Sequence, residues 1–478
     1  MNFSDLFFIA YFLPLAIALY FACSFFRVAQ NICLLGLSLV FYAWGSPLHL
    51  IPMVYLIVVN YMLGSMVGAD KTVRQRKRII ALSVVLNLLP LVLLRYGADL
   101  AEAIGVGVWP QPPIGVAFFT LQAMAYVFDL SRGKARPDRN ILNVGLYITF
   151  FPTVLFGPIL RYGDLVAQIK NRRTSLEKLG QGSLRFATGL AKLVLVAYPI
   201  GMVAEHAFNM AASGNQVFDV PVMLSWLGVI AFSLKIYLAF SAFSDMAIGL
   251  AGIFGFTLKE NFNYPYTVLT VTDFWKCWHI SLFRWFYKYV YLALGASRLK
   301  LVRRRGAIVR RNLIVSNLLL LWTLIGLWHG LSWNYLLWGM WFFVFYVFEW
   351  IVRLPYRNIK NPVWRIYLLL AVCLSWVLFR CHSLNESLNY FANLLGLTSN
   401  GFYSDLAMLL LKENWLPLAL GVILCTPLGR LPQKWLAGES GVLRDLLAVL
   451  YVVAVAVIFI LSLIYLNRTG PMPLPFIF

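Results

Sequence analysis

The chain has 478 residues, of which 61% are hydrophobic and 12% charged, with a mean hydropathy of +0.77. A soluble domain is about half apolar and about a quarter charged, so this composition excludes an ordinary soluble protein and indicates a polytopic membrane protein. The formal net charge of +21 does not indicate nucleic-acid binding, because the cations lie in short loops between apolar runs, as membrane orientation requires.

Apolar runs long enough to cross a hydrocarbon core of about 30 Å recur along the whole chain. We predict an all-α membrane protein with about twelve transmembrane helices, near residues 6–24, 31–46, 50–68, 79–95, 114–130, 183–205, 222–240, 312–328, 333–352, 363–380, 415–429 and 444–466. The first run lacks a basic n-region and a cleavage site, so we interpret it as a span and not a signal peptide. Residues 1–478 are predicted to form a single integral-membrane domain.

Two further apolar stretches contain helix-breaking residues. Residues 141–160 include FFPTVLFGP, and residues 243–256 contain three glycines, Gly249, Gly252 and Gly255. Pro and Gly at membrane depth are typical of re-entrant segments, which we predict for both stretches. At the second predicted turn, polar side chains either line a pocket or cap broken helices, namely Ser241, Ser244 and Asp245.

Loop charge predicts the orientation. One set of loops is rich in Lys and Arg, at residues 71–78, 131–139, 161–178, 298–311 and 353–365. The alternate loops are poor in cations, at residues 96–113, 206–221 and 382–414. The positive-inside rule therefore places the first set in the cytoplasm and both termini outside. This orientation requires that the two predicted re-entrant stretches do not cross the membrane.

Residues 272–294 have too many charges for a span and are rich in Trp and Tyr. Trp275, Trp278, Leu282 and Trp285 recur at spacings of three and four residues, which places aromatic rings on one face of a helix. We predict a cytoplasmic interfacial helix. Composition alone favours a simple membrane anchor.

Two of the five histidines are candidates for chemistry, His279 in the predicted interfacial helix and His329 in the segment 312–334. A neutral imidazole can abstract a proton from a hydroxyl group, and burial keeps it neutral. Each could equally be a packing histidine with a satisfied hydrogen bond. The other three lie at predicted outer span ends, where a solvated histidine is ordinary, at positions 49, 206 and 382.

The signatures of soluble catalysts are missing from the sequence, including the G-x-S-x-G elbow, the P-loop and H-E-x-x-H. The six cysteines form no C-x-x-C pair and indicate neither a zinc site nor a disulfide framework. We therefore predict no metal and no bound cofactor. No residues that would bind a cofactor can be assigned.

Several long motifs, in the right order, resemble the membrane-bound O-acyltransferase superfamily, and within it the bacterial alginate O-acetyltransferase type. They are FFPTVLFGPILRY (150–162), KIYLAFSAFSDMAIG (235–249), DFWKCWHISLFRWFYKYVYLALG (273–295) and LWHGLSWNYLLWG (327–339). The opening FSDLFFIAYFLPLAIALYF and FYAWGSP are also similar to that family. The resemblance covers most of the chain.

The resemblance implies a multi-pass acyltransferase of the bacterial inner membrane, with a tunnel joining the two membrane faces. It implies that His329 is the catalytic residue and His279 a second functional residue. The implied reaction moves an acetyl group from a cytoplasmic thioester, acetyl-CoA as co-substrate, toward an extracytoplasmic polysaccharide. Implied partners are membrane lipids, polysaccharide export machinery and a periplasmic or membrane-anchored acetyltransferase.

Three alternatives remain at this point. The same fold could transfer D-alanine or acetylate peptidoglycan. A transporter or polysaccharide channel would have ionisable residues in several spans and a two-fold repeat, and neither is visible in the sequence. A non-catalytic scaffold of an export system would tolerate replacement of both histidines.

Overall fold

The computed structural model describes residues 1–67, 71–103, 114–213, 216–217, 220–294, 307–352, 362–431 and 441–474. The chain divides into two compact units. Unit 1 contains residues 1–187, 243–259 and 466–478, and unit 2 contains residues 188–242 and 260–465.

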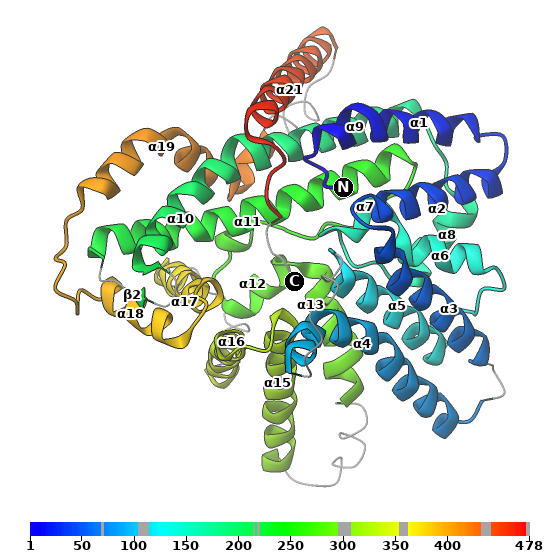
Figure 1. Ribbon diagram of the computed structural model, residues 1–478, viewed down its shortest axis with the longest axis horizontal. Helices are drawn as coiled ribbons and strands as arrows, with labels where there is room; N and C mark the ends of the chain where they lie inside the picture. Colours follow the sequence, from blue (N-terminus) through cyan, green and yellow to red (C-terminus); the bar gives the residue numbers. More distant parts are fainter. Residues whose placement is uncertain are drawn as a thin grey trace. The chain divides into compact units, whose positions relative to one another are not determined.

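Unit 1 is built from helices of the first part of the chain (Figure 1). They are η1 (Phe8–Phe12), α1 (Leu13–Ala22), α2 (Arg27–Ala43), η2 (Pro47–His49), α3 (Leu50–Met66), α4 (Val73–Ala103), α5 (Val116–Ser131), α6 (Ile141–Thr149), α7 (Phe151–Val154), α8 (Tyr162–Asn171) and most of α9 (Leu176–Ala191). The last part of α11 (Val222–Ile253) also belongs to unit 1. Helix α5 packs against α3 and α4, while α6 packs against α2 and α3. Every residue of α5 is buried, so this helix forms the centre of unit 1.

Unit 2 is also almost entirely helical. It contains η3 (Lys192–Ala197), α10 (Tyr198–Ala211), the first part of α11 (Val222–Ile253), η4 (Pro265–Thr267), α12 (Val271–Cys277), α13 (Ile280–Phe286), η5 (Tyr287–Tyr291), α15 (Ala307–His329), α16 (Trp333–Ile351), α17 (Val363–Arg380), α18 (Leu384–Leu394), α19 (Asp405–Leu424), η7 (Pro427–Arg430) and most of α21 (Val442–Thr469). Two two-residue strands, β1 (Ala212–Ser213) and β2 (Gln216–Val217), pair antiparallel.

Eight helices of the described residues are long and apolar enough to cross a membrane. Three of the predicted spans, at 6–24, 31–46 and 114–130, correspond to shorter apolar helices of 10–17 residues. The prediction of an all-α membrane protein is therefore confirmed, whereas twelve crossings are not. The predicted span at 363–380 coincides with α17.

One predicted break is present in the structure and the other is not. Within residues 141–160, helix α6 ends at Thr149 and the short α7 begins at Phe151. Residues 243–253, in contrast, continue α11 without interruption. The serines do not break this helix, since the Ser241 hydroxyl donates to the carbonyl oxygen of Leu238 within it. Only Gly255, with a φ of 83°, has the left-handed backbone that ends a helix.

The glycines of α11 serve close packing instead. A Cβ at Gly249 would lie 2.7 Å from the carbonyl oxygen of Gly182 in α9. A Cβ at Gly182 would lie 2.6 Å from the carbonyl oxygen of Gly249. Small residues allow membrane helices to approach closely. The helix break that we predicted for a re-entrant segment at 243–256 is therefore absent from residues 243–253. The glycines of α11 let α9 approach closely and do not turn the backbone.

An ion pair stabilises the same part of unit 1. Arg185 of α9 donates from Nε and Nη2 to Asp245 Oδ1 of α11, at 3.1 and 2.8 Å. The two side chains are 30% and 29% exposed. We expect Arg185→Met alone to lower the free energy of unfolding by about 2 kcal/mol, because Asp245 loses both hydrogen bonds from the guanidinium. The loss is smaller than for a fully buried pair, because water screens these partly exposed side chains.

The Arg185→Met/Asp245→Asn double variant should recover part of that loss. Thermal unfolding in detergent of the wild type, both single variants and the double variant measures this coupling. Additive losses would show that the pair does not contribute to stability.

The predicted interfacial helix at 272–294 is not one helix. It is divided into α12, α13 and the π-helical turn η5, with a break at Trp278 and His279. The predicted aromatic face is buried within the protein, since Trp275, Trp278 and Trp285 are 3%, 4% and 6% exposed. The periodicity therefore reflects packing in the core of unit 2, and our interpretation of it as a membrane-facing surface is wrong.

Candidate active site

A sharp turn between α12 and α13 positions His279. Helix α12 begins at the side chain of Thr270, which accepts the backbone N–H of Asp273. After Cys277 the backbone is extended at Trp278 and left-handed at His279, with φ 39° and ψ 54°. A left-handed conformation is uncommon for a residue other than glycine and is often found at functional sites. The surrounding contacts must therefore hold this turn in place.

The preceding segment supplies those contacts. The backbone N–H of Asn263 donates to the carbonyl of Cys277, and the N–H of Ile280 donates to the carbonyl of Asn261, each at 2.9 Å. The N–H of Ser281 donates to Asn261 Oδ1 at 3.0 Å. Residues 261–263 therefore bond to the chain on both sides of His279.

The His279 side chain is 4% exposed. Its ring lies edge-on to Phe240, with 4.7 Å between centroids, and stacks with Phe262 at 6.3 Å. Its Nδ1 is 3.4 Å from Asn261 Oδ1. Burial among these rings lowers the pKa of His279 to about 3, so the imidazole is neutral at physiological pH.

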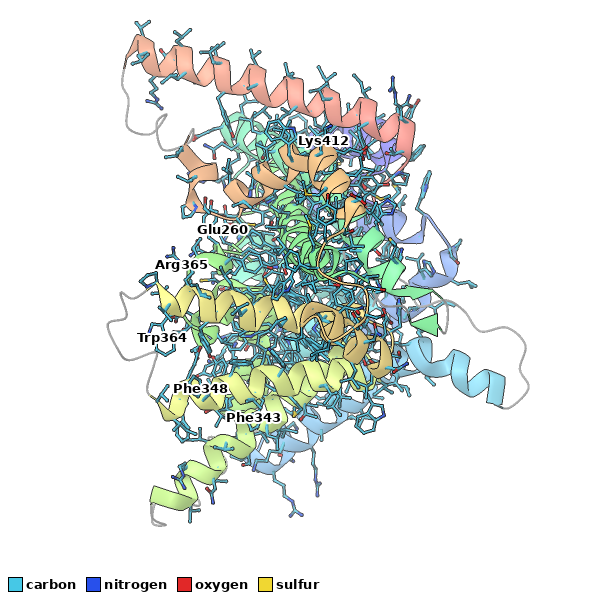
Figure 2. The ribbon with its side chains drawn as sticks, turned by 90° about the vertical axis from the view of Figure 1, so that its left-hand side faces the viewer. Glu260, Phe343, Phe348, Trp364, Arg365 and Lys412 are labelled. Carbon is cyan, nitrogen blue, oxygen red and sulfur yellow. The ribbon has the colours of Figure 1, made fainter. Side chains whose placement is uncertain are left out.

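Helix α12 is also held at its first turn by a buried carboxylate. Glu349 of α16 is 0% exposed and accepts the backbone N–H groups of Val271 and Thr272, at 2.5 and 2.9 Å. The hydroxyl of Tyr367 in α17 donates to it at 3.2 Å. Figure 2 shows the neighbouring Phe348 on α16, and Trp364 and Arg365 at the start of α17. One carboxylate thus connects α16 with α17 and with the start of α12, the helix that precedes His279.

We expect Glu349→Ala to lower the stability of the folded protein by about 3 kcal/mol, because the buried N–H of Val271 and the half-buried N–H of Thr272 both lose their acceptor. Glu349→Gln retains one acceptor oxygen and should lose less. Thermal unfolding in detergent measures both effects. The exposed Glu413 on α19 provides a control, and equal shifts for Glu413→Ala and Glu349→Ala would contradict the expectation.

His329 is the last residue of α15 and is partly exposed. Its ring contacts Trp338 of α16 and Phe379 of α17 edge-on, each with 5.0 Å between centroids, and Tyr335 at 6.1 Å. The α15–α16 turn is fixed by Asn334, whose amide donates to the carbonyls of Cys381 and Ser383 and to the Ser387 hydroxyl. Three helices therefore surround His329.

Both candidate histidines lie in unit 2, and a series of ring contacts connects their surroundings. From the Phe262 ring beside His279, successive centroid distances are 5.3 Å to Trp278, 5.2 Å to Trp376 and 6.1 Å to Trp338. Trp338 then contacts His329. The sequence placed the two histidines in separate elements, and the structure shows one aromatic core contacting both.

Sequence reasoning missed two residues of this site, Asn261 and Glu349. The sequence does contain a signal for Glu349, since it is an acid within an otherwise apolar run, where ionisable residues are costly. Most of the cation-rich loop at 298–311 lies outside the described residues. Ser241 bonds within α11, and Asp245 bonds to Arg185 of α9.

Comparison with known proteins identifies the class. The family model described as "MBOAT, membrane-bound O-acyltransferase family" matches residues 6–389. The chain is 34% identical to the probable alginate O-acetylase AlgI of Azotobacter vinelandii, over 82% of this chain and 77% of the relative. It is 33% identical to the protein of the same name from Pseudomonas aeruginosa, over 80% and 73%. The peptidoglycan O-acetyltransferase of Helicobacter pylori is 25% identical over 82% and 79%.

The apolar helices and these matches define a multi-pass membrane enzyme that transfers acyl groups. The chain belongs to the membrane-bound O-acyltransferase family.

Proposed function

We propose that this acyltransferase moves an acetyl group from cytoplasmic acetyl-CoA to hydroxyl groups of an extracytoplasmic polysaccharide, in the inner membrane of a bacterium. The observation that carries the proposal is the 34% identity, over 82% of the chain, to a relative named as an alginate O-acetylase. Transfer passes either directly to the polymer or through a periplasmic or membrane-anchored acetyltransferase partner belonging to the export machinery.

His329 acts in this proposal as the general base. It takes the proton of an acceptor hydroxyl while the hydroxyl oxygen bonds to the acyl carbon and the C–S bond breaks. The imidazolium then returns that proton to the sulfur of coenzyme A, which leaves as the thiol. The rings of Trp338 and Phe379 against His329 support this role because they limit the imidazole to a few orientations. His279, neutral and buried, orients the acyl donor.

Expression in a bacterium that exports unacetylated alginate, because its own acetylase has been deleted, tests the proposal. We expect base-labile acetyl esters to appear on the secreted polymer. Membranes from the same cells should release thiol from acetyl-CoA and not from a D-alanyl carrier-protein thioester. Thiol release from the D-alanyl thioester alone would overturn the proposal in favour of D-alanyl transfer.

A further inference from the structure

Asn261 is fully buried beside His279, with 0% exposure. Its backbone carbonyl accepts from Ile280, directly after His279. Its side-chain Oδ1 accepts the N–H of Ser281 at 3.0 Å and lies 3.4 Å from His279 Nδ1. The residue therefore contacts the left-handed turn through both its backbone and its side chain.

These contacts determine which atom of the amide faces the histidine. The backbone N–H of Ser281 can only donate, so the atom that it faces must be the amide oxygen of Asn261. The same oxygen faces His279 Nδ1, which must then carry the proton. A neutral imidazole has one N–H, so Nε2 of His279 is left as the acceptor nitrogen.

The other end of the amide points to a ligand. Asn261 Nδ2 is buried and has no hydrogen-bond partner within the described part of the chain. The rings that contact His279, those of Phe240 and Phe262, carry no acceptor atom. A buried donor without an acceptor is costly and calls for an explanation. An oxygen atom of a bound substrate would supply the acceptor.

We propose that Asn261 is a further functional residue of this enzyme: its Oδ1 holds His279 in the Nδ1–H tautomer, and its Nδ2 donates to the carbonyl oxygen of the acyl thioester. The proposal rests on acyl transfer at this site as proposed above. The carbonyl oxygen gains negative charge as the acyl carbon is attacked, so a pre-positioned N–H donor stabilises it most in the transition state. Loss of this donor should therefore lower kcat and leave KM unchanged.

Two variants separate the two ends of the amide. Asn261→Ala removes both acceptor and donor. Asn261→Asp keeps an acceptor for Ser281 and His279, removes the donor and adds a negative charge. Asn263 offers a matched control, because it lies two residues away, is exposed, and bonds to Cys277 through its backbone N–H, which Asn263→Ala leaves in place.

The pH profile gives a readout that a merely structural role would not move. A carboxylate at position 261 favours the imidazolium form of His279 and raises its pKa, so the acid limb of kcat should move to higher pH in Asn261→Asp and not in Asn261→Ala. Burial is the cause of the low His279 pKa in the wild type. The Lys, Arg, Asp and Glu side chains on the segments of unit 2 that carry Phe240, Phe262 and His279 are Lys235, Glu260, Asp273, Lys276 and Arg284. Cys277 and Tyr237 are neutral titratable groups in the same segments.

The measurement is the rate of thiol release by membranes that contain each variant. Acetyl-CoA and a D-alanyl carrier-protein thioester are offered separately. Each rate is divided by the amount of folded protein, which is determined by size-exclusion chromatography. We expect both Asn261 variants to lower kcat about 10²-fold, with KM unchanged and with Asn263→Ala like the wild type. Unchanged kcat per folded molecule in Asn261→Ala would overturn the inference while leaving the proposed function intact. If the wild type consumes only the D-alanyl thioester, the proposed function fails, and the same comparison on that donor still decides the role of Asn261.

Discussion

Replacing His329 with alanine is expected to lower acetyl transfer by about 10³-fold, because a general base contributes about 10²–10⁴-fold to the rate. The fold should survive the change. His329 ends α15 and is partly exposed, so its removal creates no closed cavity in the core. The rate of acetyl transfer per folded molecule should therefore fall. It is measured with radiolabelled acetyl-CoA in membranes and divided by the amount of enzyme that elutes as a monodisperse peak.

Two further variants sharpen this measurement. His329→Gln keeps a polar side chain against Trp338 and Phe379 but cannot hold the transferred proton, so it should be as inactive as the alanine variant. His206, exposed on α10, is the control, and His206→Ala should retain full transfer. Full transfer by His329→Ala would rule out His329 as the base and favour a scaffold role for the chain.

The sequence predicted the helices well where length and apolar composition decide the outcome. Helix α17 matches its predicted span at 363–380, since a long apolar run has no other way to satisfy its backbone in a membrane. The stretch 243–256 was misjudged because the same glycines could either break a helix or let another helix approach. The contact with Gly182 on α9 decides between these two, and Gly182 lies 67 residues before Gly249 in the sequence.

Prediction of the site from the sequence was limited in a similar way. The histidine-bearing motifs indicated His279 and His329, but a helical periodicity could not show that the backbone turns left-handed at His279. That turn is held by Asn261, which reaches it from another loop, while Glu349 of α16 bonds to the first turn of α12. Trp275 and Trp278 have the spacing of an interfacial helix, yet their rings pack against Trp322 and Trp376 of other helices. Long-range partners of this kind leave no local pattern.

The crossing of α15 and α16 provides the second large effect that we predict. A Cβ at Gly326 of α15 would lie 2.5 Å from the carbonyl oxygen of Tyr335, and a Cβ at Gly339 of α16 would meet the carbonyl oxygen of Trp322. Both obstacles are backbone atoms, which cannot rotate away. The two glycines therefore permit the close approach that positions His329 against Trp338.

Gly339→Val should force these helices apart, lower the free energy of unfolding by about 3 kcal/mol or more, and sharply reduce the monodisperse protein recovered in detergent. Gly36 of α2 is a matched control, because nothing lies within 4 Å of its Cβ position. Gly36→Val should be recovered like the wild type, since no neighbour has to move. A wild-type yield and melting temperature for Gly339→Val would show that the helices can separate without cost, and the backbone contact would then not be what holds His329 in place.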